Sequence, residues 1–180
     1  MTQTTRTKGI ERKILIELYK FALELSNQDI PRLYELGHYL TDNLISKICM
    51  LIGEEEGINY KFTNSRGAVQ TKGFYWLYND ILKEIYPSAP DYSDIEKLHE
   101  QRNIYQHSEW SITYHYNNEF ARNYIKEAKN IMIATNIIKT GNEINPTNYL
   151  LKKNTKLDRS KDIKTNLLKC HHALENICDF

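Results

Sequence analysis

Apolar residues recur every three or four positions through most of this chain, which is the spacing of helices that bury one face. The first stretch of this kind covers residues 9–25, and the polar pair at 26–27 interrupts it. A second covers residues 29–53, with Pro31 in its first turn and Gly53 where the residue after a helix end is expected. Two long helices therefore open the chain, as in a helical bundle.

The middle of the chain predicts a surface connection followed by a third helix. Residues 54–67 combine an acidic cluster with two glycines and polar residues, so we interpret them as a connection. Helical spacing returns in residues 68–86, and Pro87 ends this helix. An aromatic cluster on it can stack on bases, but we favour packing in the core or in a dimer interface. The cluster comprises Phe74, Tyr75, Trp76 and Tyr78.

Two more helices are predicted in the next part of the chain. Ser93 and Glu96 have the spacing of a capping box, so a fourth helix starts at Ser93. Residues 111–116 alternate and contain β-branched and aromatic types, which fits a short extended excursion or a loop. The pair Asn117 and Asn118 then caps a fifth helix with a broad apolar face, and Gly141 closes it.

The composition fits one globular domain in a reducing compartment. The chain has 180 residues, enough for a sizeable core, with a net charge of +1 and 41% hydrophobic residues. These values imply neither a disordered chain nor a uniformly basic surface, so any RNA contact is expected to be local. No apolar run approaches the roughly 18 residues of a membrane span, and no secretory signal opens the chain. With an odd number of cysteines, we expect a cytoplasmic protein without a structural disulfide.

The helical pattern weakens beyond Gly141. We therefore expect residues 1–141 to form the bundle, and residues 142–180 to form a basic linker and a C-terminal helix. The linker is either a solvated connection or an arm that follows the phosphates of RNA. The side chains that we assign to RNA binding are Lys152, Lys153, Lys156 and Arg159.

Two groups of metal-ligating residue types lack the arrangement that a metal site needs. Residues 54–56 are successive glutamates whose side chains point in different directions. Cysteines and histidines within residues 170–178 match no closed tetrahedral site. A lone histidine, His38, is interpreted as a solvated or satisfied side chain rather than a ligand. We expect no metal and no other cofactor.

The most distinctive group of polar residues lies on the fourth helix. At about 100° per residue, Arg102 falls on the same stripe as the apolar residues Ile95 and Leu98. An arginine cannot shed its charge, so it must either reach a cleft or find a buried anion. Asn103 lies one turn before His107 and can hydrogen-bond its ring. Arg102 and His107, however, are roughly 140° apart and cannot share one face of a regular helix.

The segment from Arg102 to His107 reads RNIYQH and is set late in a helical chain, before a loop and another long helix. It resembles the HEPN family of small helical bundles, whose signature is Arg, four to six residues and then His, commonly with a polar residue such as Asn directly after the Arg. The resemblance covers residues 8–141. It implies an all-α, HEPN-like bundle of about five helices that forms a homodimer.

The resemblance also implies a metal-independent endoribonuclease that acts in defence or stress response. In catalytic members of the family, the Arg and His of two subunits meet in one cleft at the dimer interface. Carried over to this chain, Arg102 holds the scissile phosphate of RNA and His107 transfers a proton. Asn103 orients the His107 ring or donates to the phosphate. The ribose 2′-OH of the RNA is then the nucleophile, so the reaction needs no metal-bound water.

One departure from the family and two alternatives stay open. A toxin branch has Tyr two residues after the His, where a partner nucleotidyltransferase modifies it, whereas this chain has Glu109. A toxin and antitoxin pair of that kind is therefore disfavoured, while other defence contexts and a regulatory partner are not. The alternative to catalysis is an inactive HEPN-like bundle that binds RNA or nucleotide, or that serves as an assembly module. A purely structural dimerisation domain is the third interpretation.

Overall fold

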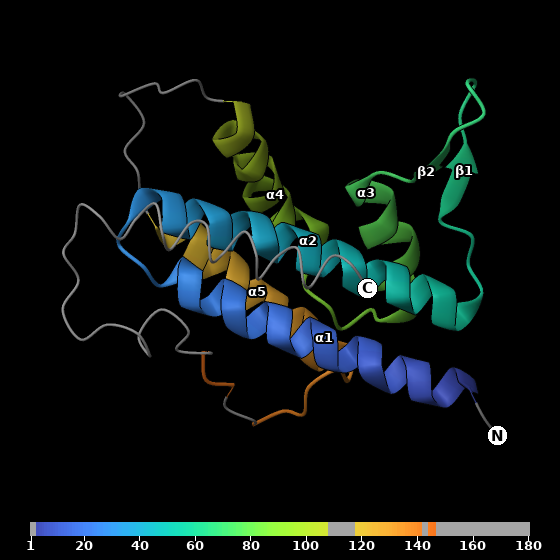
Figure 1. The fold of residues 1–180 in the computed structure, drawn as a ribbon, viewed down its shortest axis with the longest axis horizontal. Coiled ribbons are helices and arrows are strands. Elements are labelled where there is room, and N and C mark those ends of the chain that lie inside the picture. The colour runs from blue at the N-terminus through green and yellow to red at the C-terminus, as the bar shows by residue number, and fades with distance from the viewer. Residues whose placement is uncertain (1–2, 108–117, 142–143, 147–180) are drawn as a thin grey trace. The chain divides into compact units, whose positions relative to one another are not determined.

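A computed structural model of the chain describes residues 3–107, 118–141 and 144–146. It confirms an all-α fold with about five helices, and it adds one small hairpin that the sequence pattern did not predict (Figure 1). The predicted extension at residues 142–180 lies outside these ranges apart from 144–146. The division of the chain at Gly141 therefore stays a prediction. The elements are α1 (Gln3–Ser26), α2 (Pro31–Glu56), β1 (Lys61–Thr63), β2 (Val69–Thr71), α3 (Phe74–Trp76) with its continuation η1 (Leu77–Lys83), α4 (Tyr92–His107) and α5 (Glu119–Ala134).

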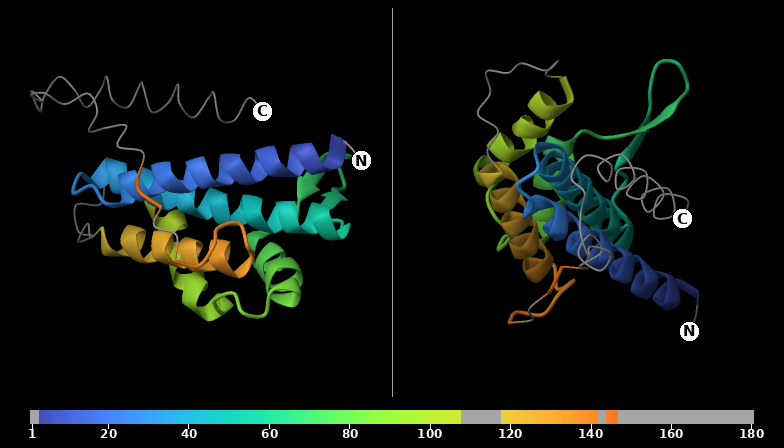
Figure 2. Two further views of the ribbon diagram at one scale, coloured as in Figure 1. Left: turned by 90° about the horizontal axis from the view of Figure 1, so that it is seen from below. Right: turned by 60° about the vertical axis from the view of Figure 1, so that its left-hand side comes forward.

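The helices α1, α2 and α5 lie side by side and enclose most of the core (Figure 2). The apolar stripes predicted from their sequences provide the buried side chains, and α4 and η1 pack against the same bundle. Close approach of α1 and α2 depends on Gly37, because a Cβ there would lie 2.6 Å from the backbone nitrogen of Ser26. Large side chains buried in this core include Leu18, Leu25, Leu44, Ile45, Ile48, Ile81, Ile95 and Ile131.

The end of α2 differs from the sequence prediction. Gly57, and not Gly53, follows the last helical residue, with a φ of 69° in the left-handed region that favours glycine. Gly53 is a buried residue inside α2, where a Cβ would lie 3.0 Å from Cδ1 of Ile81 and 3.1 Å from Cδ1 of Tyr60. The prediction was wrong because the glycine at 53 serves a close side-chain approach and not a turn.

A short β-hairpin occupies the second half of the predicted surface connection at 54–67, and residues 54–56 belong to α2. Strands β1 and β2 pair antiparallel, with Phe62 opposite Gln70, and every residue of both strands is exposed. The side-chain oxygen of Asn64 accepts hydrogen bonds from the backbone nitrogens of Arg66 and Ala68, which closes the turn. Strands of three residues are too short to show the alternation that identifies a strand in a sequence.

The third helix begins at Phe74 and not near residue 68, because residues 69–71 pair in the hairpin. Beyond Trp76 the helix widens into the π-helix η1, and this turn buries two adjacent pairs of side chains. Lys83 at its end donates to the carbonyl oxygens of Pro87 and Ala89 at 2.9 and 2.8 Å. These bonds order the loop that leads into α4. The buried side chains of η1 are Leu77, Tyr78, Ile81 and Leu82.

The predicted boundaries of the last two helices also need correction. Helix α4 begins at Tyr92, so Ser93 lies in its first turn and is not the cap. Helix α5 follows Asn118, whose side chain makes no capping bond and instead donates to Oδ1 of Asp29 at 2.9 Å. It ends at Ala134, well before Gly141. The sequence predicted a longer helix because Ile138, beyond the end of α5, is also buried and continues the apolar pattern.

No helix within the described ranges is both long and apolar enough to cross a bilayer.

Candidate functional site

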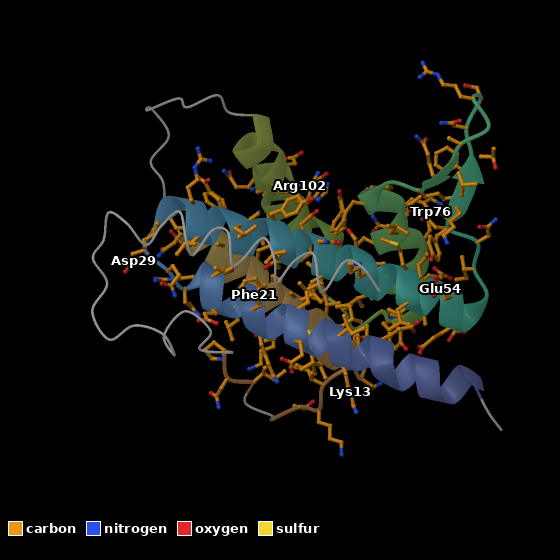
Figure 3. All side chains as sticks on the ribbon, viewed as in Figure 1. Lys13, Phe21, Asp29, Glu54, Trp76 and Arg102 are labelled. Carbon is orange, nitrogen blue, oxygen red and sulfur yellow. The ribbon has the colours of Figure 1, made fainter. Side chains whose placement is uncertain are left out.

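Arg102 lies on α4 at the edge of the bundle (Figure 3). Ile95 and Leu98, on the same stripe, are buried, whereas the Arg102 side chain is 28% exposed. Its Nε lies 3.7 Å from Oδ2 of Asp42, and its guanidinium carbon lies 5.4 Å from the centre of the Tyr39 ring. Of the two alternatives that the sequence leaves for this arginine, the structure shows the buried anion, with one part of the side chain still facing solvent.

Asp42 of α2 connects three elements of the bundle. Its side chain is only 8% exposed, and its Oδ1 accepts a hydrogen bond from the Tyr124 hydroxyl of α5 at 2.7 Å. The same oxygen lies 2.6 Å from Nδ1 of His99 on α4. We call Asp42, His99, Arg102 and Tyr124 the Asp42 cluster. A buried carboxylate needs such donors, because burial without partners costs several kcal/mol.

His99 is held in a defined orientation within the Asp42 cluster. Because a carboxylate oxygen only accepts hydrogen bonds, Nδ1 of the neutral ring carries the hydrogen. Phe74 stacks on the ring, with 4.0 Å between the ring centres and 4° between the planes. The side chain is 19% exposed, and no residue of the described ranges hydrogen-bonds its Nε2. The ring therefore keeps one nitrogen available at the surface.

His38 lies next to the Asp42 cluster but has a structural environment. It is fully buried, its Nε2 lies 2.6 Å from the carbonyl oxygen of Leu98, and its ring centre lies 4.8 Å from that of Tyr124. Burial lowers the pKa of His38 to about 4, although the bond to Leu98 and the nearby Asp42 oppose this. The interpretation of His38 as a satisfied side chain is confirmed, but inside the core and not on a helix surface.

Tyr124 acts as a permanent donor in the cluster. Burial raises the pKa of its hydroxyl well above the usual value, and the negative charge of Asp42 raises it further. The phenol therefore keeps its hydrogen at neutral pH. This leaves Oδ1 of Asp42 with two donors, one from Tyr124 and one from His99.

The structure places only part of the predicted site. The backbones of Asn103 and His107 continue α4 beyond Arg102, while their side chains, like Glu109, lie outside the described part of the structure. Their distances to Arg102 and to one another are therefore not shown. The predicted RNA-binding residues also lie outside the described ranges. These are Lys152, Lys153, Lys156 and Arg159.

Asp42 and His99 are the two polar residues that the sequence interpretation missed. His99 lies three residues before Arg102, so the two side chains share one face of α4, and this spacing was a usable signal. Asp42 follows Thr41 within the long apolar pattern of α2, where an ionisable residue on a buried stripe requires a partner. Which partner it has depends on how α2, α4 and α5 meet, and the sequence does not contain that information directly.

Two glutamates of the acidic cluster at the end of α2 form contacts with other side chains of the protein. Glu55 forms an ion pair with Arg12 of α1 at 3.2 Å, and the Tyr60 hydroxyl donates to the carboxylate of Glu54. Within the described residues, no group of three or more His, Cys, Asp or Glu side chains is arranged to hold a metal ion.

Comparisons with models of protein families, with curated proteins and with solved structures find no match for this chain.

Proposed function

We propose that the protein is a metal-independent endoribonuclease of the HEPN type, which acts in the cytoplasm in defence or stress response. The observation that carries the proposal is the placement of Arg102. It is the only arginine among the described residues of α4, and it combines partial exposure with two contacts that fix its direction, Asp42 and Tyr39. The same helix carries Asn103 and His107, which complete the family motif.

The proposed chemistry uses what RNA itself supplies. The ribose 2′-OH attacks the adjacent phosphorus, and the bond from phosphorus to the 5′ oxygen breaks. Arg102 stabilises the charge that develops on the phosphate, and His107 transfers a proton near pH 7. Asn103, one turn from His107, orients its ring. Each of the charge and proton contributions is of the order of two to four powers of ten in rate.

The proposed site is completed by a second copy of the chain. On a regular helix, Arg102 and His107 point roughly 140° apart, so one protomer does not direct both at the same phosphate. In a homodimer, Arg102 of one protomer can join His107 of its partner. Light scattering is expected to give about twice the 21.3 kDa of one chain. A monomer at tens of micromolar would remove the composite site.

The decisive experiment is RNA cleavage by the purified protein in EDTA. We expect a 2′,3′-cyclic phosphate or its hydrolysis product, and no cleavage where a single 2′-deoxy group precedes the scissile bond. Arg102→Ala and His107→Ala should abolish the activity, whereas Lys97→Ala, which removes an exposed cation of α4, should retain it. Cleavage of the deoxy substrate, or strict dependence on added magnesium, would contradict the mechanism.

The Asp42–Arg102 contact also supports a second candidate function. A carboxylate near Arg102 already balances part of its charge, which fits a bundle that binds RNA or nucleotide without cleaving it. The same experiment separates the two functions, because this candidate gives RNA that is retained by the protein and stays intact.

The basic stretch beyond the bundle has a proposed role in affinity. If Lys152, Lys153, Lys156 and Arg159 follow the phosphates of RNA, their joint replacement by Gln should make binding less dependent on salt. Cleavage at saturating RNA should persist. An unchanged salt dependence would identify the stretch as a solvated connection.

A further inference from the structure

His99 and Arg102 lie three residues apart on α4, and both approach the carboxylate of Asp42, His99 at Oδ1 and Arg102 at Oδ2. Both side chains are partly exposed, by 19% and 28%. A potential proton donor or acceptor and a fixed cation thus face the same edge of the bundle. The family motif uses Arg102 but has no role for His99.

We propose that His99, positioned by Asp42, is a second proton-transfer residue of the site and acts beside Arg102 on the RNA phosphodiester. The inference rests on the proposed ribonuclease function and adds to it the group that removes the 2′-OH proton. Asp42 fixes the hydrogen on Nδ1, so the lone pair of the neutral ring is on Nε2, the nitrogen that no described residue occupies. Asp42 also stabilises the imidazolium that forms when Nε2 takes up a proton.

The surroundings of His99 hold its ring in place for this role. Phe74 from α3 covers one face of the ring, and Tyr124 from α5 holds the carboxylate that bonds the ring. The charged and titratable groups that contact His99 or its carboxylate partner are Asp42 of α2, Arg102 on its own helix and Tyr124 of α5, and His38 interacts electrostatically with Asp42 and His99. His38 stays neutral in the core, so Asp42 is the only negative charge among them.

The proposed step balances in protons and bonds. Nε2 of His99 takes the proton of the 2′-OH while the 2′ oxygen forms its bond to phosphorus. The bond from phosphorus to the 5′ oxygen breaks, and this oxygen takes a proton from the protonated form of His107 of the partner protomer. The products are a 2′,3′-cyclic phosphate and a 5′-OH. Hydrolysis or exchange with solvent returns both histidines to their starting forms.

The test of His99 uses asparagine, because its amide group has the shape of the part of the imidazole ring that contains Nδ1. In His99→Asn, the Asn amide nitrogen stands near the place of Nδ1 and can still donate to Asp42, while Nε2 is lost. We expect its kcat to fall at least about a hundredfold with little change in KM, because proton transfer is typically worth that factor or more. Asp42→Asn should lower kcat less and shift the pH profile. Lys97→Gln on the exposed face of α4 should change neither.

A spectroscopic measurement tests the pairing of His99 with Asp42 independently of RNA cleavage. In the full chain with ¹⁵N-labelled histidine, neutral His99 is expected to carry its hydrogen on Nδ1, with signals assigned by their loss in His99→Asn. Asp42→Asn should weaken this preference. A neutral His99 with the hydrogen on Nε2 would overturn the inference, because the nitrogen at the surface would then have no lone pair for the 2′-OH proton.

The failure of this inference and the failure of the proposed function give different results. If His99→Asn, folded by circular dichroism, cleaves RNA with the rate and pH profile of the wild type, His99 has no role in the reaction and the ribonuclease function stands. If the wild-type protein does not cleave RNA, the proposed function fails, and the role of His99 in RNA cleavage fails with it. The tautomer measurement then decides only whether Asp42 orients the ring.

Discussion

The hydroxyl of Tyr124 on α5 donates a 2.7 Å hydrogen bond to Oδ1 of Asp42 on α2. Both residues are buried, so this bond connects two helices through a charged acceptor inside the core. It also leaves the carboxylate oriented toward α4, where His99 and Arg102 lie. The stability of the bundle and the geometry of the candidate site therefore depend on the same carboxylate.

Tyr124→Phe is expected to lower the free energy of unfolding by about 1.5–3 kcal/mol, the usual contribution of a hydrogen bond to a charged group. The ring stays, so packing changes little, and urea denaturation should show a lower midpoint with an unchanged slope. Tyr75→Phe removes the hydroxyl of a tyrosine that is exposed on α3 and serves as the control. A loss of equal size in both variants would contradict a special role for the bond to Asp42.

His38 is expected to make the protein less stable in mild acid. Its pKa is lowered to about 4 by burial, whereas an unfolded chain has the ordinary value near 6.5. Between these values the unfolded state binds a proton that the folded state does not, so stability is complete above about pH 6.5 and falls as the pH drops toward 4. The slope from this residue is about 1.4 kcal/mol per pH unit.

The comparison with His38→Gln isolates the effect, because Gln can still donate to the carbonyl oxygen of Leu98 but does not titrate. Urea denaturation of both proteins between about pH 4 and 7, which covers the two pKa values, should give a shallower pH dependence for the variant. Identical pH dependence would mean that the pKa of His38 is the same in the folded and the unfolded protein.

Gly37→Ala should destabilise the contact between α1 and α2. The new Cβ would meet the backbone nitrogen of Ser26 at 2.6 Å and its Oγ at 2.7 Å, so one helix must move. We expect a loss of about 1–3 kcal/mol, as for other overpacked cores, despite the better helix propensity of Ala. Thermal unfolding measures it.

Gly9→Ala is the matched control for that substitution, since a Cβ at Gly9 meets nothing within 4 Å. It should leave the melting temperature unchanged or raise it slightly. If the two alanine variants melt alike, the close approach at Gly37 is not what sets the spacing of the helices.

Arg102→Ala is expected to abolish RNA cleavage while the fold survives. Its contact with Asp42 is long, at 3.7 Å, and partly exposed, so its loss should cost no more than about 1 kcal/mol. Asp42 also keeps its bonds to Tyr124 and His99. Circular dichroism and urea denaturation check the fold. Loss of the helical signal would assign Arg102 to structure instead.

Much of the helical architecture follows from the sequence because it depends on local periodicity. The apolar stripes of α1, α2 and α5 identify these helices and their buried faces. Helix ends were less predictable, since the same residue type meets different needs. Gly53 allows close packing while Gly57 ends the helix, and Asn118 reaches across to Asp29 where a cap was expected.

Part of the candidate site could likewise be predicted from the sequence, and part could not. Arg102 could be recognised because a charge on an apolar stripe requires an explanation within its own helix. Asp42 lies on another helix, 60 residues earlier in the chain, and its partners come from α4 and α5. Such a cluster is a property of how three helices meet. A search for polar residues on every buried stripe would have proposed its members without pairing them.

The π-helix η1 sets the rotational position of the segment before it. Ile81 and Leu82 anchor η1 in the core, and Phe74, on its N-terminal side, stacks on His99. Deleting one residue within η1 would allow an ordinary α-helix, and the preceding turn would rotate by about 100° about the helix axis. Phe74 would then swing away from the imidazole although no side chain of the Asp42 cluster had changed. The number of residues in η1, and not only their identity, thus determines whether the Phe74 ring stacks on His99.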